Sequence, residues 1–205
     1  GTKNVLEACK KNNVKKIVIA SSAAVYGEGM YGMKLKENTK TDPVSPYGKS
    51  KLIMEQEIEK NILKYNKLDC VILRFFNIFG VGQTSEYAGV ITKFVKRILS
   101  DKPLEVFGDG MQTRDFVSIH DIVESINAAI KNGKNGTYNI ASGKAITINE
   151  LAEFMMSLSG KNLEIRHISE KHGDIRSSEA DISLAKSKIG YVPKLGLNEI
   201  KTLLE

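Results

Sequence analysis

Apolar residues along the chain follow two patterns, one typical of helices and one typical of buried strands. Residues 1–9 carry apolar side chains at helical spacing, and residues 16–21 form a continuous run that predicts a strand covered on both faces. The same reasoning predicts a second helix over about 46–66 and a second buried strand over 70–76. Strands that alternate with helices favour right-handed crossovers and a parallel sheet, so the predicted fold class is α/β.

Shorter elements follow from about residue 80 onward, and they predict a smaller α/β cap. No linker separates the two halves, so we expect them to share an interface and to bind a ligand in the cleft between them. The predicted elements are helices at 88–100, 119–131, 149–158, 181–189 and 197–204, and strands near 104–107, 113–118, 137–140 and 163–168.

Composition and charge exclude several classes of protein. The net charge of +6 comes from 30 Lys and Arg scattered against 24 Asp and Glu, which predicts a solvated surface and no nucleic-acid interface. The longest apolar stretch, 17–26, is about half of the ~20 residues that a membrane span needs, so no span is expected. Cys9 and Cys70 lie in apolar contexts, which is typical of small buried side chains in a reducing compartment and predicts the cytoplasm.

The sharpest chemical candidate is the pair formed by Tyr47 and Lys51 on the first turns of the second helix. Four residues are just over one helical turn, so the phenol and the ammonium group project from the same face. Tyrosine is a poor base at neutral pH, but a fixed cation beside it favours the phenolate. The same spacing also occurs where a buried tyrosine lies beside the stem of a surface lysine, so other features must decide.

Three other groups of residues accompany this pair. Ser21 and Ser22 come at the carboxyl end of the first strand, where open parallel sheets bind their ligands, although serines there are also common in turns. The second strand ends in Asn77 and a glycine. Arg114 lies beside a strand and suits bidentate capture of phosphate. The alternative interpretation is a surface arginine that forms an ion pair with a neighbouring aspartate.

In their order along the chain, these segments resemble the extended short-chain dehydrogenase/reductase family, and the nearest branch looks like the nucleotide-sugar 4-epimerases. The resemblance covers essentially all 205 residues. It implies a partial doubly wound, Rossmann-like parallel sheet over 1–79 and a substrate-binding region over 80–205, with segments near 115–142 returning to the first domain. The segments that carry it are 18–27, 45–51, 74–80 and 114–117.

The resemblance also implies a role for single residues. Tyr47 would transfer a proton with Lys51 as its partner, Ser22 would bind a sugar hydroxyl group, and NAD would be the cofactor. The substrate would be a UDP-sugar or another NDP-sugar, and no metal is expected. Lys171 stands where the family usually has an arginine, and Arg176 would compensate. The implied cofactor-binding residues are Ala20, Ser21, Tyr47, Lys51 and Phe76, and the implied substrate-binding residues are Ser22, Asn77, Arg114, Lys171 and Arg176.

The implied reaction interconverts UDP-glucose and UDP-galactose through a 4-keto sugar. Related dehydratases carry acidic residues where this chain has Ala23 and Ala24, which favours chemistry confined to C4. The alternatives are a nucleotide-sugar reductase, another NDP-sugar epimerase, or a non-catalytic fragment that binds nucleotide sugars.

Two expectations concern the whole molecule. The glycine-rich dinucleotide turn of the family is absent, which predicts a truncated form of a longer enzyme that begins in the middle of the fold. The resemblance further implies a homodimer that pairs through the opening helix and the second helix. The apolar residues expected on the dimer face of the second helix are Leu52, Ile53 and Leu63.

Overall fold

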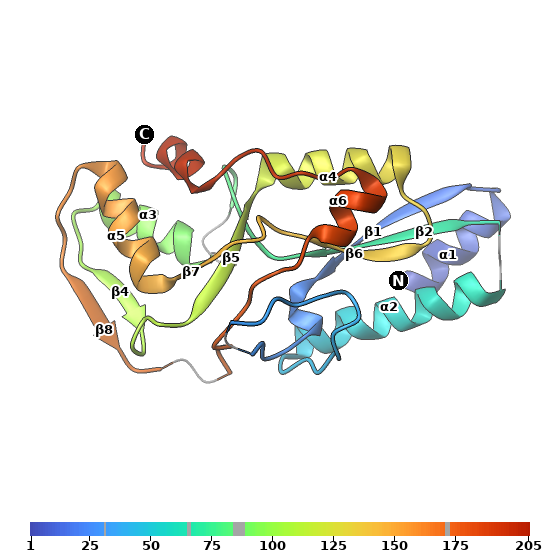
Figure 1. Cartoon of the computed structure of the whole chain (residues 1–205), viewed down its shortest axis with the longest axis horizontal. Helices are drawn as coiled ribbons and strands as arrows, with labels where there is room; N and C mark the ends of the chain where they lie inside the picture. Colours follow the sequence, from blue (N-terminus) through green and yellow to red (C-terminus); the bar gives the residue numbers. More distant parts are fainter. Residues whose placement is uncertain (31, 65–66, 84–88, 171–172) are drawn as a thin grey trace.

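The computed structural model describes residues 1–30, 32–64, 67–83, 89–170 and 173–205 (Figure 1). Its main sheet has three parallel strands: β1 (Lys16–Ser22), β2 (Asp69–Phe75) in the centre and β6 (Gly136–Ile140). The α/β fold class with a parallel sheet is therefore confirmed. Because β6 pairs with β2, a segment from the second half of the chain lies in the same sheet as the two strands of the first half.

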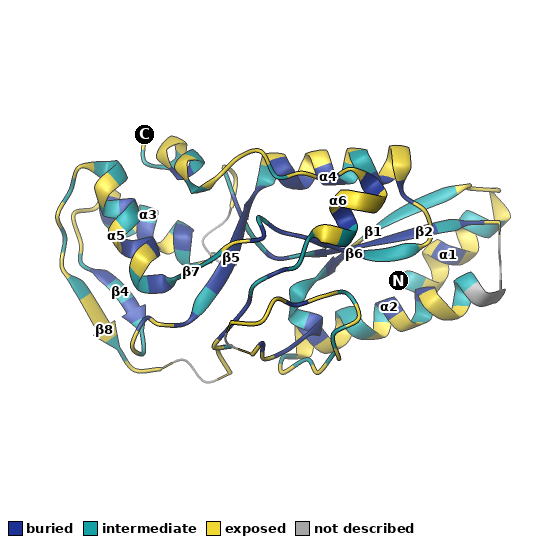
Figure 2. Ribbon diagram, viewed as in Figure 1, coloured by how far each residue is buried: buried dark blue, intermediate teal, exposed yellow. Residues whose placement is uncertain are grey.

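Helices cover both faces of this sheet (Figure 1). On one side lie α1 (Thr2–Lys11) and α2 (Pro46–Lys64), and on the other side lie α4 (Ile119–Asn132) and α6 (Ser183–Ile189). This double cover explains why the sheet strands consist mainly of apolar residues, and in Figure 2 β2 is largely dark blue.

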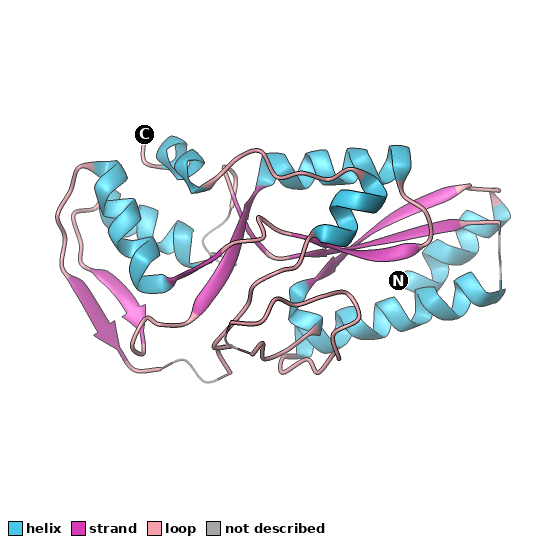
Figure 3. Ribbon diagram, viewed as in Figure 1, coloured by secondary structure: helices cyan, strands magenta, loops and turns pink. Residues whose placement is uncertain are grey.

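The smaller part of the molecule contains the remaining strands and helices. In a second sheet, β5 pairs in parallel with β3 and antiparallel with β7, and in a third sheet β4 pairs in parallel with β8. Figure 3 shows α3 and α5 beside these strands. These helices and the strand β4 contribute to one buried apolar cluster that includes Phe94, Leu104, Leu151 and Met155. The bounds are β3 (Asn77–Phe79), α3 (Val90–Leu99), β4 (Leu104–Phe107), β5 (Thr113–Ser118), β7 (Ala145–Thr147), α5 (Ile148–Ser159), β8 (Ile165–Ile168) and the 3-10 helix η2 (Leu197–Leu203).

The sequence patterns miss three short elements. The pattern predicts one strand over 70–76 and no strand after it, but the chain leaves the main sheet at Phe76 and enters the second sheet as β3. The N–H of Phe76 donates to the carbonyl of Ile140. The strand β7 and the 3-10 helix η1 (Ala23–Val25) have three residues each, which is too few for a hydrophobic period to appear.

The start of α2 follows the predicted capping pattern. The hydroxyl oxygen of Ser45 accepts a hydrogen bond from the N–H of Gly48 at 3.0 Å, and Pro46 occupies the first helical position. No helix formed by the described residues combines the length and the apolar content that crossing a membrane requires.

Candidate active site

The amino-terminal end of α2 lies against the carboxyl end of β1, and Gly48 makes this close approach possible. A Cβ atom on Gly48 would lie 2.4 Å from the carbonyl oxygen of Ala24 in η1, which directly follows Ser22 and the end of β1. The backbones of α2 and η1 are therefore in contact. This contact brings the first turn of α2, with Tyr47, to the edge of the sheet where parallel strands place their ligands.

Tyr47 and Lys51 share one face of α2, as their spacing predicts. The Lys51 ammonium nitrogen lies 5.7 Å from the centroid of the Tyr47 ring and donates a 2.9 Å hydrogen bond to the carbonyl of Ala20. The Tyr47 residue is 56% exposed, and its hydroxyl group has no hydrogen-bond partner within the described part of the chain. The strand thus holds the cation beside the phenol and leaves the phenol oxygen free to meet a ligand.

The two serines at the end of β1 have different surroundings because successive strand residues point to opposite faces. Ser21 is buried, and its hydroxyl group donates to the carboxylate of Glu55 on α2. Ser22 is partly exposed, and its oxygen accepts from the N–H of Ala24 at 3.2 Å. A cofactor contact by Ser21 is therefore left to its main chain, and Ser22 keeps its hydroxyl hydrogen for another acceptor.

Phe76 lies at the crossing from β2 to β3. Its ring is buried and packs against Tyr26 at 6.3 Å between centroids with a tilt of 40°. Its expected contact with a nicotinamide remains a prediction.

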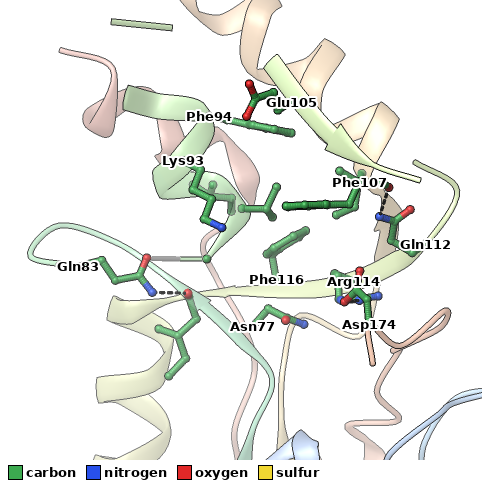
Figure 4. Close-up of a pocket in the computed structure, with 15 residues that line it drawn as sticks. Asn77, Gln83, Lys93, Phe94, Glu105, Phe107, Gln112, Arg114, Phe116 and Asp174 are labelled. Carbon is green, nitrogen blue, oxygen red and sulfur yellow. Dashed lines mark hydrogen bonds and ion pairs between the residues drawn. The ribbon is translucent and has the colours of Figure 1, made fainter. Parts of the chain in front are cut away.

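A cavity of about 380 Å³ opens between α3 and the strands β3, β4 and β5 (Figure 4). It brings together Asn77 and Arg114, two of the predicted substrate-binding residues from separate motifs. Ser22 pairs in register with Phe75, and Asn77 follows Phe75 by two residues, so the cavity begins near the strand end that carries Ser22. Tyr47 and Lys51 do not line the cavity itself.

The predicted substrate-binding arginines are both engaged in ion pairs. Arg114 is only 8% exposed, and its Nη2 atom lies 2.6 Å from the carboxylate of Asp174, 60 residues away in the chain. Arg176 lies in an adjoining hollow of about 110 Å³ and pairs bidentately with Asp109 at 2.7 and 2.6 Å. Hydrogen bonds from Arg176 hold the pKa of Asp109 at about 2. Lys171 lies outside the described residues.

Several cavity residues are missed by motif reasoning. Lys93 on α3 lies with its ammonium nitrogen 5.8 Å from the centroid of Phe107, and Gln112 donates to the Phe107 carbonyl at 2.9 Å. The strand period of two offers a signal for part of this set, because Arg114 and Phe116 are two residues apart and both face the cavity. Among the described residues, no three His, Cys, Asp or Glu side chains are grouped as metal ligands would be.

Asp115 lies on the opposite face of β5 and ties three segments together. It is fully buried, and its carboxylate accepts hydrogen bonds from the N–H and the hydroxyl group of Ser142, from the N–H of Gly143 and from the N–H of Ala180. Burial raises the pKa of Asp115 to about 6, although these hydrogen bonds oppose the shift. The Asp115 carbonyl also accepts from the Asn77 amide at 3.0 Å, so this strand supports the cavity wall.

The raised pKa of Asp115 predicts a specific pH dependence of stability. In the unfolded chain this carboxyl group titrates near 3.8, so the folded state binds more protons between pH 4 and 6. We expect the free energy of unfolding of the wild type, minus that of Asp115→Asn, to fall by about 3 kcal/mol as the pH rises through this window. Urea unfolding of both proteins from pH 4 to 8 measures the difference, and a difference that stays constant or rises contradicts the assignment.

Gly48→Ala is expected to destabilise the protein although alanine is the better helix former. The added methyl group would lie 2.4 Å from the Ala24 carbonyl and 2.9 Å from Cβ of Pro43, and relieving such contacts costs about 1–3 kcal/mol. Gly196→Ala is the matched control, because a Cβ at Gly196 meets nothing within 4 Å. Thermal unfolding that shows equal midpoints for the two variants would refute the close contact.

Comparison with known proteins identifies the family of this chain. A sequence profile described as the NAD dependent epimerase/dehydratase family matches residues 1–141. A putative UDP-glucose 4-epimerase of Methanocaldococcus jannaschii is 38% identical over 204 residues, which cover 97% of this chain and 65% of the relative. The chain thus spans less than two thirds of the length of that relative.

Two solved structures have the same fold. A UDP-N-acetylglucosamine 4-epimerase from Methanobrevibacter ruminantium M1, in complex with UDP-N-acetylmuramic acid, superposes with a TM-score of 0.91 at 37% identity over 98% of this chain and 66% of that one. A UDP-glucose 4-epimerase from Thermotoga maritima, with UDP-glucose, gives a TM-score of 0.93 at 32% identity over 99% and 66%. With the profile match over more than half of its residues, the chain belongs to the NAD dependent epimerase/dehydratase family.

Proposed function

We propose that this chain is part of a NAD-dependent epimerase that inverts C4 of the hexose in a nucleotide sugar. The observation that carries the proposal is the position of Lys51, held between the Tyr47 ring and the Ala20 carbonyl at the end of β1. This arrangement leaves the phenol oxygen open to a ligand with a fixed cation beside the ring, which suits Tyr47 to the role of proton-transferring group. Activity is proposed for a polypeptide that also carries the part of the relatives' length that this chain lacks, called the complete enzyme below.

The residues at the strand end fit a nicotinamide cofactor, because the free phenol and the lysine stand together at the edge where parallel sheets bind dinucleotides. The chemistry that NAD supplies when bound is reversible hydride transfer at C4, with no net oxidation of the sugar. Tyr47 as phenolate accepts the proton of the C4 hydroxyl group and returns it when the carbonyl is reduced on its other face. Ser22 donates its hydroxyl hydrogen to the same sugar oxygen and orients it.

The cavity supports the second half of the proposal, which concerns the nucleotide. Arg114 would bind a diphosphate with its planar guanidinium group by exchanging its ion pair with Asp174, while Asn77 offers an amide and Lys93 adds a positive charge. The rings of Phe107 and Phe116 give the apolar surface on which a nucleobase packs. A nucleoside diphosphate held there is a remote anchor, which leaves the hexose free to turn over near Ser22 while the oxidised sugar stays bound.

We further propose UDP-glucose and UDP-galactose as the substrate pair. The test incubates the complete enzyme with each sugar nucleotide and follows the anomeric protons by NMR without added reductant. Interconversion supports the proposal, and consumption of added NADH or NADPH identifies a reductase instead. Conversion of UDP-N-acetylhexosamines alone would move the assignment to that substrate pair, which the M. ruminantium relative favours by name. Inertness toward every 4-hydroxy sugar nucleotide overturns epimerisation.

The chain alone tests the non-catalytic alternative by isothermal titration with UDP and with NAD. Because the cavity is built from residues of this chain, we expect UDP to bind. UDP binding by this chain, with no turnover by the complete enzyme, would leave a nucleotide-sugar-binding protein as the function.

A homodimer through α1 and α2 is also proposed. These helices lie side by side, and each exposes an apolar residue, Val5 on α1 and Ile53 on α2 (Figure 1). We expected Leu52 to face outward with Ile53, but it packs against the buried cluster of Tyr26 and Phe76. The side chain of Leu63 lies outside the described residues. Light scattering of Ile53→Asp against the wild type tests this face.

The free thiols of Cys9 and Cys70 fit the cytoplasmic location that we propose.

A further inference from the structure

A buried ion pair ties α2 to the main sheet two helical turns beyond Tyr47. Glu55 on α2 is 1% exposed and Arg74 on β2 is 5% exposed. The Arg74 Nη2 atom lies 2.6 Å from one carboxylate oxygen of Glu55, and its Nε atom lies 3.0 Å from the other. The hydroxyl group of Ser21 on β1 donates to the same carboxylate. One side chain of the helix is therefore bound to the carboxyl ends of two adjacent strands.

Arg74 is fixed from the sheet side as well. Its Nη1 atom donates to the hydroxyl group of Tyr26 at 2.9 Å and to the carbonyl of Glu37 at 3.0 Å, and its guanidinium carbon lies 4.8 Å from the Tyr26 ring centroid. The Tyr26 hydroxyl group in turn donates to Asn139 on β6 at 2.6 Å. The guanidinium group thus belongs to a network of hydrogen bonds that reaches β6, and the partner of Glu55 is itself held by Tyr26 and Glu37.

The position of Glu55 on the helix connects this frame to the reacting groups. Tyr47, Lys51 and Glu55 are spaced by four residues, so they share one face of α2 that drifts slowly around its axis. Glu55 lies about 12 Å along the axis from Tyr47. At the amino-terminal end Gly48 lies against the Ala24 carbonyl, and Leu52 packs in the cluster that includes Val25 of η1. Farther along, Ile58 is buried against the sheet. Apolar contacts of this kind are not directional, whereas the hydrogen bonds of Glu55 have fixed directions.

Stability alone does not account for the pair. Buried ion pairs contribute about as much as well-packed apolar side chains of equal volume, and their distinctive property is directional geometry. We propose that Glu55, held by Arg74 and Ser21, is a positioning residue that sets the rotation of α2 and so keeps Tyr47 and Lys51 beside the strand end where the proton is transferred. This inference rests on the proposed function.

The test is made with Glu55→Gln in the complete enzyme. The amide keeps the shape of the side chain but loses the charge that binds the guanidinium group. Because a displacement of about 1 Å lowers a rate roughly 100-fold, we expect kcat to fall about 10- to 100-fold while KM and the affinity for UDP stay within about twofold. Ser21→Ala gives a smaller loss of the same kind.

Asp121→Asn is the matched control. Asp121 is also a buried carboxylate, and it accepts from the N–H groups of Lys194 and Leu195 at 2.9 and 3.0 Å, on the other side of the sheet. We expect this variant to lose stability and to keep its kcat. If Glu55→Gln and Asp121→Asn lose kcat equally, general destabilisation explains both losses, and the inference is overturned.

A second variant separates positioning from packing. Glu55→Leu combined with Arg74→Met fills the same volume with apolar side chains and makes no directional bonds. A double variant with the stability of the wild type and a low kcat supports the inference. A double variant with the kcat of the wild type overturns it. If the wild type is inert toward all 4-hydroxy sugar nucleotides, the proposed function fails, and hydrogen exchange on this chain still decides the inference. We expect the amides of residues 47–51 to exchange faster in Glu55→Gln than in Asp121→Asn. If Glu55→Gln does not fold, Ser21→Ala takes its place in this comparison. Unchanged exchange rules the positioning role out.

Discussion

Replacing Tyr47 by phenylalanine in the complete enzyme is expected to lower kcat for C4 epimerisation by about 1,000-fold. Positioned proton transfer contributes typically 10²- to 10⁴-fold, and the phenol is the only proton-transferring group of Tyr47. The hydroxyl group has no partner within the described residues and the side chain is half exposed, so folding should be unaffected. NMR assays of both directions of the reaction, beside thermal unfolding of the same samples, measure the two effects separately.

Tyr138→Phe is the control for this substitution. The Tyr138 hydroxyl group donates to the carbonyl of Lys134 at 3.4 Å, at the opposite end of β6 from the site, and losing it should leave kcat unchanged. A Tyr47→Phe enzyme that keeps more than a tenth of the wild-type kcat would show that the proton is handled by another group.

Replacing Arg114 by alanine should weaken the binding of UDP to this chain about 100-fold. Truncating one partner of a desolvated, charge-assisted contact costs about 2–5 kcal/mol, and Arg114 is the buried fork of the cavity. Arg114→Lys keeps the charge but loses the planar fork, so its affinity should fall between those of alanine and wild type. Isothermal titration with UDP gives the dissociation constants directly.

Arg166→Ala removes the same charge outside the cavity. Arg166 is exposed and, among the residues that the structure describes, its ion-pair partner is Glu164 at 3.0 Å, so its loss should change UDP affinity less than twofold. If Arg114→Ala and Arg166→Ala bind UDP equally well, the diphosphate is not held where we place it.

The sequence predicts the fold well because most of the signal is local. Continuous apolar runs define β1 and β2, and Ser45 and Pro46 mark the start of α2 between them. The face shared by Tyr47 and Lys51 follows from helix geometry alone.

The parts of the site that were missed depend on partners that are distant in the chain. Arg74 stands in an apolar strand, and nothing near it in sequence reveals that Glu55 neutralises it. Ser21 and Ser22 look alike in sequence, and only the packing of α2 on one face of β1 separates their roles. Likewise, Arg114 faces Asp174 and not its neighbour Asp115, because side chains alternate along β5.

The single-residue crossing at Phe76 has a mechanical consequence. β2 ends at Phe75 and β3 begins at Asn77, while the Phe76 N–H is bonded to Ile140 and its ring is locked against Tyr26. A hinge motion at this crossing would have to break the Phe76–Ile140 hydrogen bond and separate the Phe76 ring from Tyr26. We therefore expect this crossing to stay in place when a ligand binds, while side chains and loops around the cavity take up the change.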